Sequence, residues 1–141
     1  MNRLRRKPIY ALLGLYFLLA LLYSAVVPVL EAPDAIWHFQ YVRYLVQGRG
    51  LPYYQGRPLP MEQEASQPPL YYLLGIPFVA PINMADAARV LERNPQAAIG
   101  DASTFANKNI VVHPPFERFP YRQTTLAIHS LRLLSIFLGL I

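Results

Sequence analysis

Residues 9–30 read IYALLGLYFLLALLYSAVVPVL, and no charged side chain interrupts them. An α-helix rises about 1.5 Å per residue, so this stretch reaches roughly 33 Å and can cross a hydrocarbon core of about 30 Å. We therefore predict a transmembrane helix over residues 8–30. A secretory signal is the alternative interpretation, but its apolar region is usually only about 7 to 15 residues long. Ser24-Ala25-Val26 also matches a cleavage site poorly.

Charge is distributed unevenly along the chain. Residues 1–7 carry four of the 13 Lys and Arg, whereas all eight acidic residues lie between Glu31 and Leu126, where eight basic residues balance them. The formal net charge of +5 therefore belongs to a basic tail at residues 1–7 and to Arg132. This bias predicts a cell-membrane protein with a cytoplasmic N-terminus. It argues against nucleic acid as a partner, because a short basic cluster beside an apolar span suits a lipid bilayer.

A second apolar segment, LAIHSLRLLSIFLGLI, covers residues 126–141. Because this segment is too short to span a bilayer, we predict the start of a second transmembrane helix at residues 127–141, truncated in mid-span. Thr124 and Thr125 are its predicted N-caps, and Ser135 and Gly139 place small residues on a face suited to close helix packing. The sequence thus predicts an all-α, multi-pass membrane protein of which these residues form the first part.

Residues 31–126 are predicted to form an extracytoplasmic loop that contains amphipathic and interfacial helices. The first helix follows Asp34, its predicted N-cap, and ends at Gln47. The second, LYYLLGIPFVAPI at residues 70–82, is broken at Gly75 and Pro77, and it is predicted to lie in the membrane interface.

Asn83 can cap a third loop helix with the sequence MADAARVLER, and residues 95–122 are predicted to be ordered loop because turn signals recur there. On the first loop helix, Asp34 and His38 stand one turn apart, between two apolar strips. An ionisable pair on such a surface is unfavourable unless it is partnered or functional. Two interpretations stay open: Asp34 caps the helix while His38 hydrogen-bonds back to it, or the pair has a catalytic or ligand role.

Other polar residues stand close to the predicted membrane segments. Glu62, Glu64 and Gln67 lead into the interfacial helix, and a carboxylate there can bind a divalent metal, accept a proton or simply face solvent. Arg132 falls one to two turns inside the second predicted span, with His129 on the same face. A charge in that position generally faces protein, water or a phosphate, and snorkelling to the headgroups is the alternative.

The order of these features resembles the opening of the membrane-embedded glycosyltransferases that use polyprenyl-phosphate sugars. These C-type-fold enzymes include the protein O-mannosyltransferase-like and aminoarabinose-transferase-like proteins. After the basic tail and first span, the resemblance is carried by EAPDAIWHFQYVRYLVQGRGLP at residues 31–52, EASQPPLYYLL at 64–74 and HSLRLLSIFLG at 129–139. The resemblance covers nearly the whole chain, and it implies that these residues form the N-terminal part of such an enzyme.

The resemblance implies transfer of a sugar from a polyprenyl-phosphate donor to a glycan, lipid or protein acceptor outside the membrane. Asp34 matches the acidic residue assigned in these enzymes as general base or metal ligand, so Mg²⁺ or Mn²⁺ is a possible cofactor. The usual pattern has a second acidic residue next, where this chain has Ala35. The predicted catalytic residues are Asp34 and His38, and the predicted substrate-binding residues are Glu31, Glu64, Gln67, His129 and Arg132.

A second hypothesis is a non-catalytic multi-pass membrane protein, either a transporter segment or an assembly partner. Ala35 in place of the second acidic residue favours it. A signal-anchored soluble binding domain is a third interpretation, which the interfacial apolar run and the second apolar segment disfavour.

Overall fold

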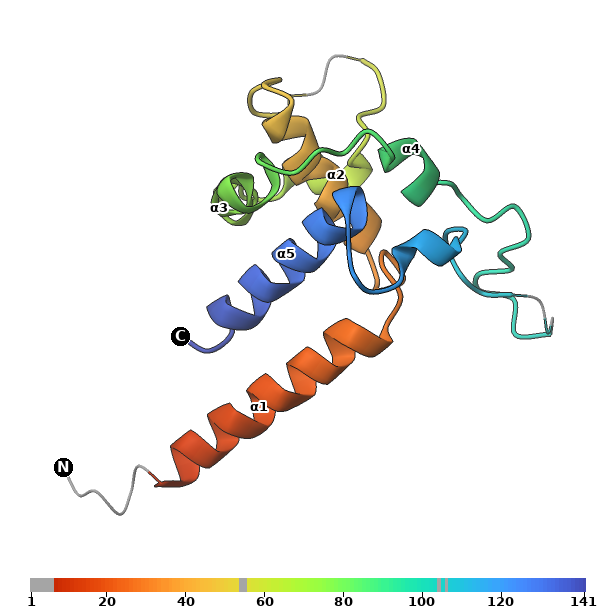
Figure 1. The fold of residues 1–141 in the computed structure, drawn as a ribbon. Helices are drawn as coiled ribbons and strands as arrows, with labels where there is room; N and C mark the ends of the chain where they lie inside the picture. The colour runs from red at the N-terminus through yellow and green to blue at the C-terminus, as the bar shows by residue number, and fades with distance from the viewer. Residues whose placement is uncertain (1–6, 54–55, 104, 106) are drawn as a thin grey trace.

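The computed structural model describes residues 7–53, 56–103, 105 and 107–141, and it is all-helical, as predicted (Figure 1). Within those residues there is no strand, although Arg93 and Val111 form an isolated bridge. The predicted basic tail lies outside the described residues except for Lys7, where the first helix begins. The elements are α1 (Lys7–Val26), α2 (Ala35–Val46), η2 (Glu62–Ser66), α3 (Leu70–Val79), α4 (Ala87–Val90), η3 (Pro115–Glu117) and α5 (Gln123–Leu138).

α1 has the length and composition of a membrane span. Its segment Pro8–Val26 is 19 residues long, and none of it is buried inside the fold. The helix ends four residues earlier than predicted, because Pro28 follows and the residue before a proline disfavours helical geometry. A helix that is apolar on all sides and unburied by its own chain is suited to lipid.

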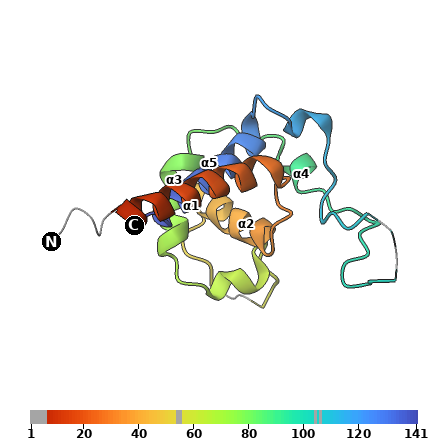
Figure 2. The same ribbon diagram turned by 90° about the horizontal axis from the view of Figure 1, so that it is seen from below.

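α5 runs antiparallel to α1 (Figure 1), and the view from below shows the two helices superposed (Figure 2). Gly139 lies against Tyr16, since a Cβ atom at Gly139 would collide with the tyrosine hydroxyl, and the rings of Phe17 and Phe137 are 6.2 Å apart. At 16 residues α5 is shorter than a span. Among the described residues α1 alone is long and apolar enough to cross a membrane, so the second span stays a prediction.

The start of α5 is held by a residue from a distant segment. Thr124 and Thr125 lie within α5, which begins at Gln123, and their side chains are fully buried in the fold. The prediction that they are N-caps is therefore wrong. Instead, Asp86 Oδ1 accepts the backbone N–H of Thr124 at 3.1 Å and the hydroxyl of the same threonine. A carboxylate in this position satisfies a free helical N–H group and complements the helix dipole.

α3 packs against both α2 and α5, and buried residues of these three helices belong to the hydrophobic core. Gly75 permits the close approach, because a Cβ atom there would lie 2.8 Å from Leu131 Cδ2 and 3.2 Å from Val42 Cγ2. α3 continues through Gly75 and Pro77 without a break, so the predicted interruption is wrong. α2 agrees with its predicted bounds to within one residue.

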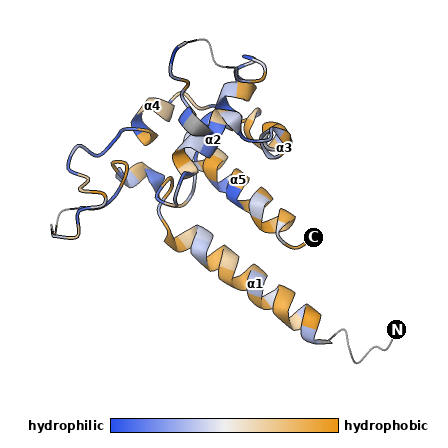
Figure 3. Cartoon of the chain, turned by 180° about the vertical axis from the view of Figure 1, so that it is seen from behind, coloured by the Kyte–Doolittle hydropathy of each residue, from blue (hydrophilic) through white to orange (hydrophobic). Residues whose placement is uncertain are grey.

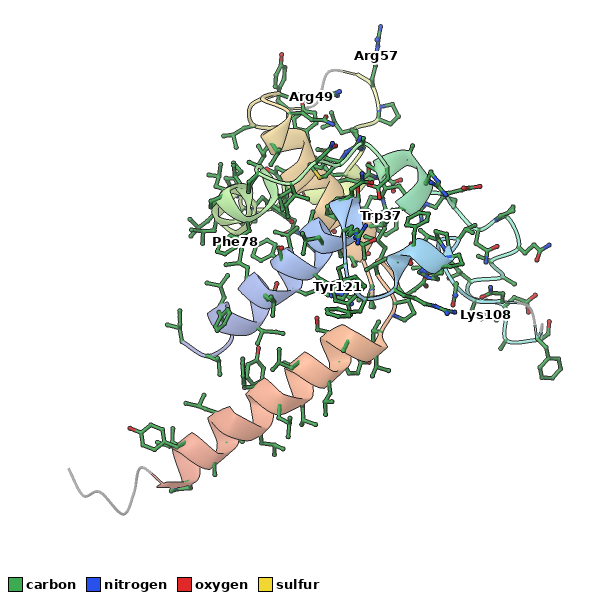
Figure 4. The ribbon with its side chains drawn as sticks, in the orientation of Figure 1. Trp37, Arg49, Arg57, Phe78, Lys108 and Tyr121 are labelled. Carbon is green, nitrogen blue, oxygen red and sulfur yellow. The ribbon has the colours of Figure 1, made fainter. Side chains whose placement is uncertain are left out.

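The outer face of α3 is apolar and exposed. Figure 1 shows α3 nearly end-on while α1 and α5 lie in the plane of the view, so α3 crosses both steeply. Figure 3 shows apolar residues on α3 as well as along α1, and Figure 4 shows Phe78 on the side of α3 away from α2. This geometry suits a helix that lies in the membrane interface. The exposed apolar residues of α3 are Leu70, Leu73, Leu74 and Phe78.

The third predicted loop helix is much shorter than expected. Asn83 Oδ1 accepts the backbone N–H of Ala85 at 2.9 Å, but the helix that follows covers only Ala87–Val90. The described part of residues 95–122 is loop apart from η3, in agreement with the prediction.

Candidate functional site

A cavity of about 400 Å³ lies where the segment that follows α1, the start of α2, α3 and α5 meet. We call it the outer cavity. A second space of about 480 Å³, the α1–α5 groove, is lined mainly by apolar residues of these two helices. The outer cavity and the groove share Ala32, Arg132 and Ser135, so they adjoin at these residues. The polar residues that line the outer cavity are His38, Tyr71, Arg132 and Ser135.

Arg132 joins α5 to the end of α1. Its Nη1 donates to the carbonyls of Ser24 at 2.7 Å and Val27 at 2.8 Å, and its Nη2 donates to the carbonyl of Pro28 at 2.7 Å. Carbonyls at the end of a helix lack partners within the helix, so a cation there is favourable. A guanidinium has five N–H donors, which leaves two that these three bonds do not use. Arg132 therefore lies level with the end of α1.

Asp34 and His38 do not form the predicted pair. Asp34 has a left-handed backbone with φ of 59°, and its side chain makes no capping hydrogen bond. Its backbone carbonyl accepts the N–H groups of Trp37 and His38, whereas His38 Nδ1 lies 2.8 Å from Tyr72 Oη. The interpretation in which His38 bonds back to Asp34 is therefore wrong. Pro33 and Ala35 line the outer cavity, but Asp34 itself does not.

Glu64 is buried beside His38. Only 4% of Glu64 is exposed, and its Oε2 lies 3.7 Å from His38 Nδ1. The Tyr72 hydroxyl hydrogen-bonds His38, and the Tyr72 ring stacks on Tyr41 at 3.8 Å. Burial, followed by the negative charge of Glu64, raises the pKa of Tyr72 to about 12. The interpretation in which the Glu64 carboxylate faces solvent is therefore wrong, whereas Glu62 is exposed to solvent as that interpretation predicts.

Glu31 lies away from the outer cavity and holds a distant loop. Its Oε2 accepts the N–H of Ile110 at 2.8 Å, and its Oε1 accepts the N–H of Val111 at 3.1 Å. Oε1 also lies 2.8 Å from His113 Nε2, and His113 Nδ1 lies 2.7 Å from Glu117 Oε2. We call Glu31, His113 and Glu117 the acidic clasp. Burial raises the pKa of Glu117, although the neighbouring His113 opposes this shift.

The acidic clasp was not predicted. Its local signal is a histidine and a glutamate four residues apart in HPPFE, and its third member is 82 residues from His113. Spacing along the chain therefore could not indicate the partner. The clasp binds the loop at residues 110–117 to the segment that follows α1.

The remaining predicted residues lie outside the outer cavity. His129 is buried and stacks on Tyr121 at 3.7 Å, in a separate cavity of about 460 Å³ that His113 also lines. Figure 4 shows Tyr121 between the start of α5 and the end of α1. Gln67 is exposed and ends η2. Although His129 and Arg132 share a helix, they line different cavities.

The described residues offer no ready site for a metal ion. In the ranges that the structure describes, no group of three His, Cys, Asp or Glu side chains could hold one. Ala35 leaves Asp34 without a neighbouring carboxylate on the chain. The residues around Asp34 therefore do not fit Mg²⁺ or Mn²⁺, and no step below uses a metal.

Comparison with known proteins leaves the interpretation to the residues themselves. No family model, curated protein or solved structure matches the chain. The resemblance to polyprenyl-phosphate-sugar glycosyltransferases thus stays a prediction from the sequence.

Replacing Glu31 with glutamine is expected to loosen the clasped loop. A neutral amide loses the charge-assisted contact to His113, and such a bond contributes about 1.5 to 3 kcal/mol. We expect trypsin to cleave after Lys108 roughly tenfold faster than in the wild type, as measured by limited proteolysis of the membrane-embedded protein. Glu92→Gln, at an exposed carboxylate nearby, is the control. Equal cleavage rates in all three proteins would contradict a role for the clasp.

Proposed function

We propose that this chain is the N-terminal part of a multi-pass membrane glycosyltransferase. It takes a sugar from a polyprenyl-phosphate donor and transfers it to an acceptor outside the membrane. One observation carries the proposal: a guanidinium lies between an apolar groove beside α1 and a cavity lined by His38. α1 spans the membrane with its N-terminus in the cytoplasm, and α5 begins a second span.

The arrangement around Arg132 matches the parts of the proposed donor. A polyprenyl chain is apolar and suits the α1–α5 groove, which Tyr16, Leu19 and Val27 line. The phosphate suits Arg132, because a guanidinium fork binds phosphate oxygens and two of its N–H groups are not used by the α1 carbonyls. The sugar then lies in the outer cavity, on the side of His38.

Backbone strain next to the outer cavity supports a functional role for this segment. Leu30 and Asp34 both have positive φ angles, of 65° and 59°. A bulky residue such as leucine rarely adopts this conformation, and strained residues gather at functional sites. Asp34 is proposed to orient the acceptor hydroxyl or to accept its proton.

The test is sugar transfer by the full-length protein in liposomes that contain a radiolabelled polyprenyl-phosphate sugar. We expect His38→Ala and Asp34→Ala each to lower the transfer rate about 100-fold or more, because a positioned acid or base contributes roughly 10² to 10⁴. Glu62→Gln, which changes an exposed carboxylate, should leave the rate unchanged. Full transfer by both alanine variants at matched expression would refute the proposed site.

A non-catalytic role in assembly or transport is the second candidate. Ala35 beside Asp34 favours it, because the paired acidic residues of the resembled enzymes are absent. In that case the wild-type protein transfers no sugar from any polyprenyl-phosphate donor in the same assay.

A further inference from the structure

Three side chains from three elements form one continuous series of polar contacts. His38 belongs to α2, Tyr72 to α3 and Glu64 to η2. His38 Nδ1 lies 2.8 Å from Tyr72 Oη and 3.7 Å from Glu64 Oε2, and the negative charge of Glu64 contributes to the raised pKa of Tyr72. Tyr72 and Glu64 are 2% and 4% exposed, whereas the His38 side chain is 42% exposed and lines the outer cavity. The series therefore runs from a buried carboxylate to an open imidazole.

The position of one proton decides what the imidazole presents to the cavity. The Glu64 carboxylate favours hydrogen on Nδ1, because its oxygen lies 3.7 Å from that nitrogen and its negative charge attracts an N–H group. Tyr72 Oη then accepts the N–H of His38 Nδ1. This arrangement fixes the tautomer: Nδ1 carries the hydrogen and Nε2 keeps its lone pair.

The opposite arrangement is unfavourable. If Tyr72 donated to Nδ1, the buried Glu64 carboxylate would lie 3.7 Å from a nitrogen that carries no hydrogen. Buried carboxylates without a donor are strongly disfavoured. The stack of Tyr72 on Tyr41 also holds the hydroxyl in place.

No described residue hydrogen-bonds His38 Nε2, and His38 lines the same cavity as Arg132. We infer that His38 Nε2 is the general base of the proposed transfer, and that Tyr72 and Glu64 are positioning residues that hold His38 in the required tautomer. This inference rests on the proposed function for its chemistry. Asp34 then orients the acceptor hydroxyl and does not accept its proton. The charged and titratable groups around His38 are Glu64 on η2, Tyr71 and Tyr72 on α3, Arg132 on α5 and Asp34 at the start of α2.

The step balances as an ordinary displacement. The acceptor hydroxyl gives its proton to Nε2 while its oxygen forms a bond to the anomeric carbon of the sugar. The bond between that carbon and the phosphate oxygen breaks, and its electron pair leaves with the polyprenyl phosphate, beside Arg132. The imidazolium that forms is stabilised by the Glu64 carboxylate through Tyr72.

The first measurement does not depend on activity. Histidine nitrogens of the full-length protein, labelled with ¹⁵N in lipid nanodiscs, report the tautomer and its titration, and the His38 signal is assigned from its loss in His38→Ala. In the wild type we expect one tautomer with hydrogen on Nδ1. In Glu64→Gln we expect both tautomers, because the carboxylate that favours hydrogen on Nδ1 is gone. Glu62→Gln is the matched control.

The second measurement is the kinetics of transfer. We expect Glu64→Gln to lower kcat about tenfold with KM unchanged, because His38 in the wrong tautomer still permits substrate binding but cannot accept the proton at Nε2. Glu64→Asp should recover part of the loss. A purely structural role for Glu64 would lower activity without changing the tautomer of His38.

Tyr72→Phe keeps the ring and its stack on Tyr41, so it tests the hydroxyl even if Glu64→Gln does not fold. A wild-type tautomer in both Tyr72→Phe and Glu64→Gln would overturn the inference, whatever the activity. A wild-type protein that transfers no sugar would overturn the proposed function. The tautomer measurement would still test whether Tyr72 and Glu64 position His38.

Discussion

Arg132→Met is expected to lower the free energy of unfolding by about 3 kcal/mol. The substitution removes the donors of three hydrogen bonds to the carbonyls of Ser24, Val27 and Pro28, and bonds from a charged donor contribute about 1.5 to 3 kcal/mol each. Water at the membrane surface replaces part of this loss. Methionine keeps the length and apolar stem of the side chain, so the change reports the donors alone.

Thermal unfolding of the full-length protein in detergent measures the effect. Arg132→Lys should be intermediate, because an ammonium keeps the charge but cannot reach three separated carbonyls in one planar fork. Arg49→Met serves as the control, since Arg49 is exposed and lies at the end of the molecule opposite α1 (Figure 4). A melting temperature for Arg132→Met equal to that of the control would show that α1 and α5 are held together by other contacts.

Gly75→Ala is expected to destabilise the protein by about 1 to 3 kcal/mol, the usual cost of overpacking. Alanine is otherwise the better helix former by about 1 kcal/mol, so the sign of the effect is diagnostic. The new methyl group would lie 2.8 Å from Leu131 Cδ2 and 3.2 Å from Val42 Cγ2. Gly14→Ala is the matched control, because a Cβ atom at Gly14 of α1 meets nothing within 4 Å.

A double-mutant cycle with Leu131→Ala identifies the cause. Shortening Leu131 removes the nearest atom, so Gly75→Ala should cost about 1 kcal/mol less in the Leu131→Ala background. Strictly additive effects would place the strain elsewhere, at Val42 or in the backbone of α3.

The helices could be predicted where their signals are local. The uncharged stretch of α1 indicates a span-length helix, and the apolar run after Gln67 indicates α3. The cap of α5 could not be predicted, because Asp86 reaches Thr124 across 38 residues. The contact of Arg132 with the end of α1 could not be predicted for the same reason, because it joins residues 104 to 108 positions apart.

In the candidate site, too, local signals could be read from the sequence but long-range contacts could not. The sequence indicates His38 and Arg132 by their charge in apolar surroundings and Glu64 by its place just before the interfacial helix. In the structure Glu64 lies beside His38, and Arg132 lines the same cavity as His38. Tyr72 belongs to the helix that is predicted to lie in the membrane interface, yet it is buried and hydrogen-bonds His38. Periodicity indicates which face of a helix is apolar, but it does not indicate which residue, 34 positions away, will complete a hydrogen bond.

The bond from Arg132 to the carbonyl of Pro28 joins residues 104 positions apart and closes the chain between them into a loop at the end of α1. In the proposed topology α1 spans the bilayer, and this bond lies near the bilayer surface. A thinner or thicker bilayer tilts a spanning helix, and the tilt would move the terminal carbonyls of α1 relative to α5. The thickness of the surrounding lipid should therefore control the shape of the outer cavity.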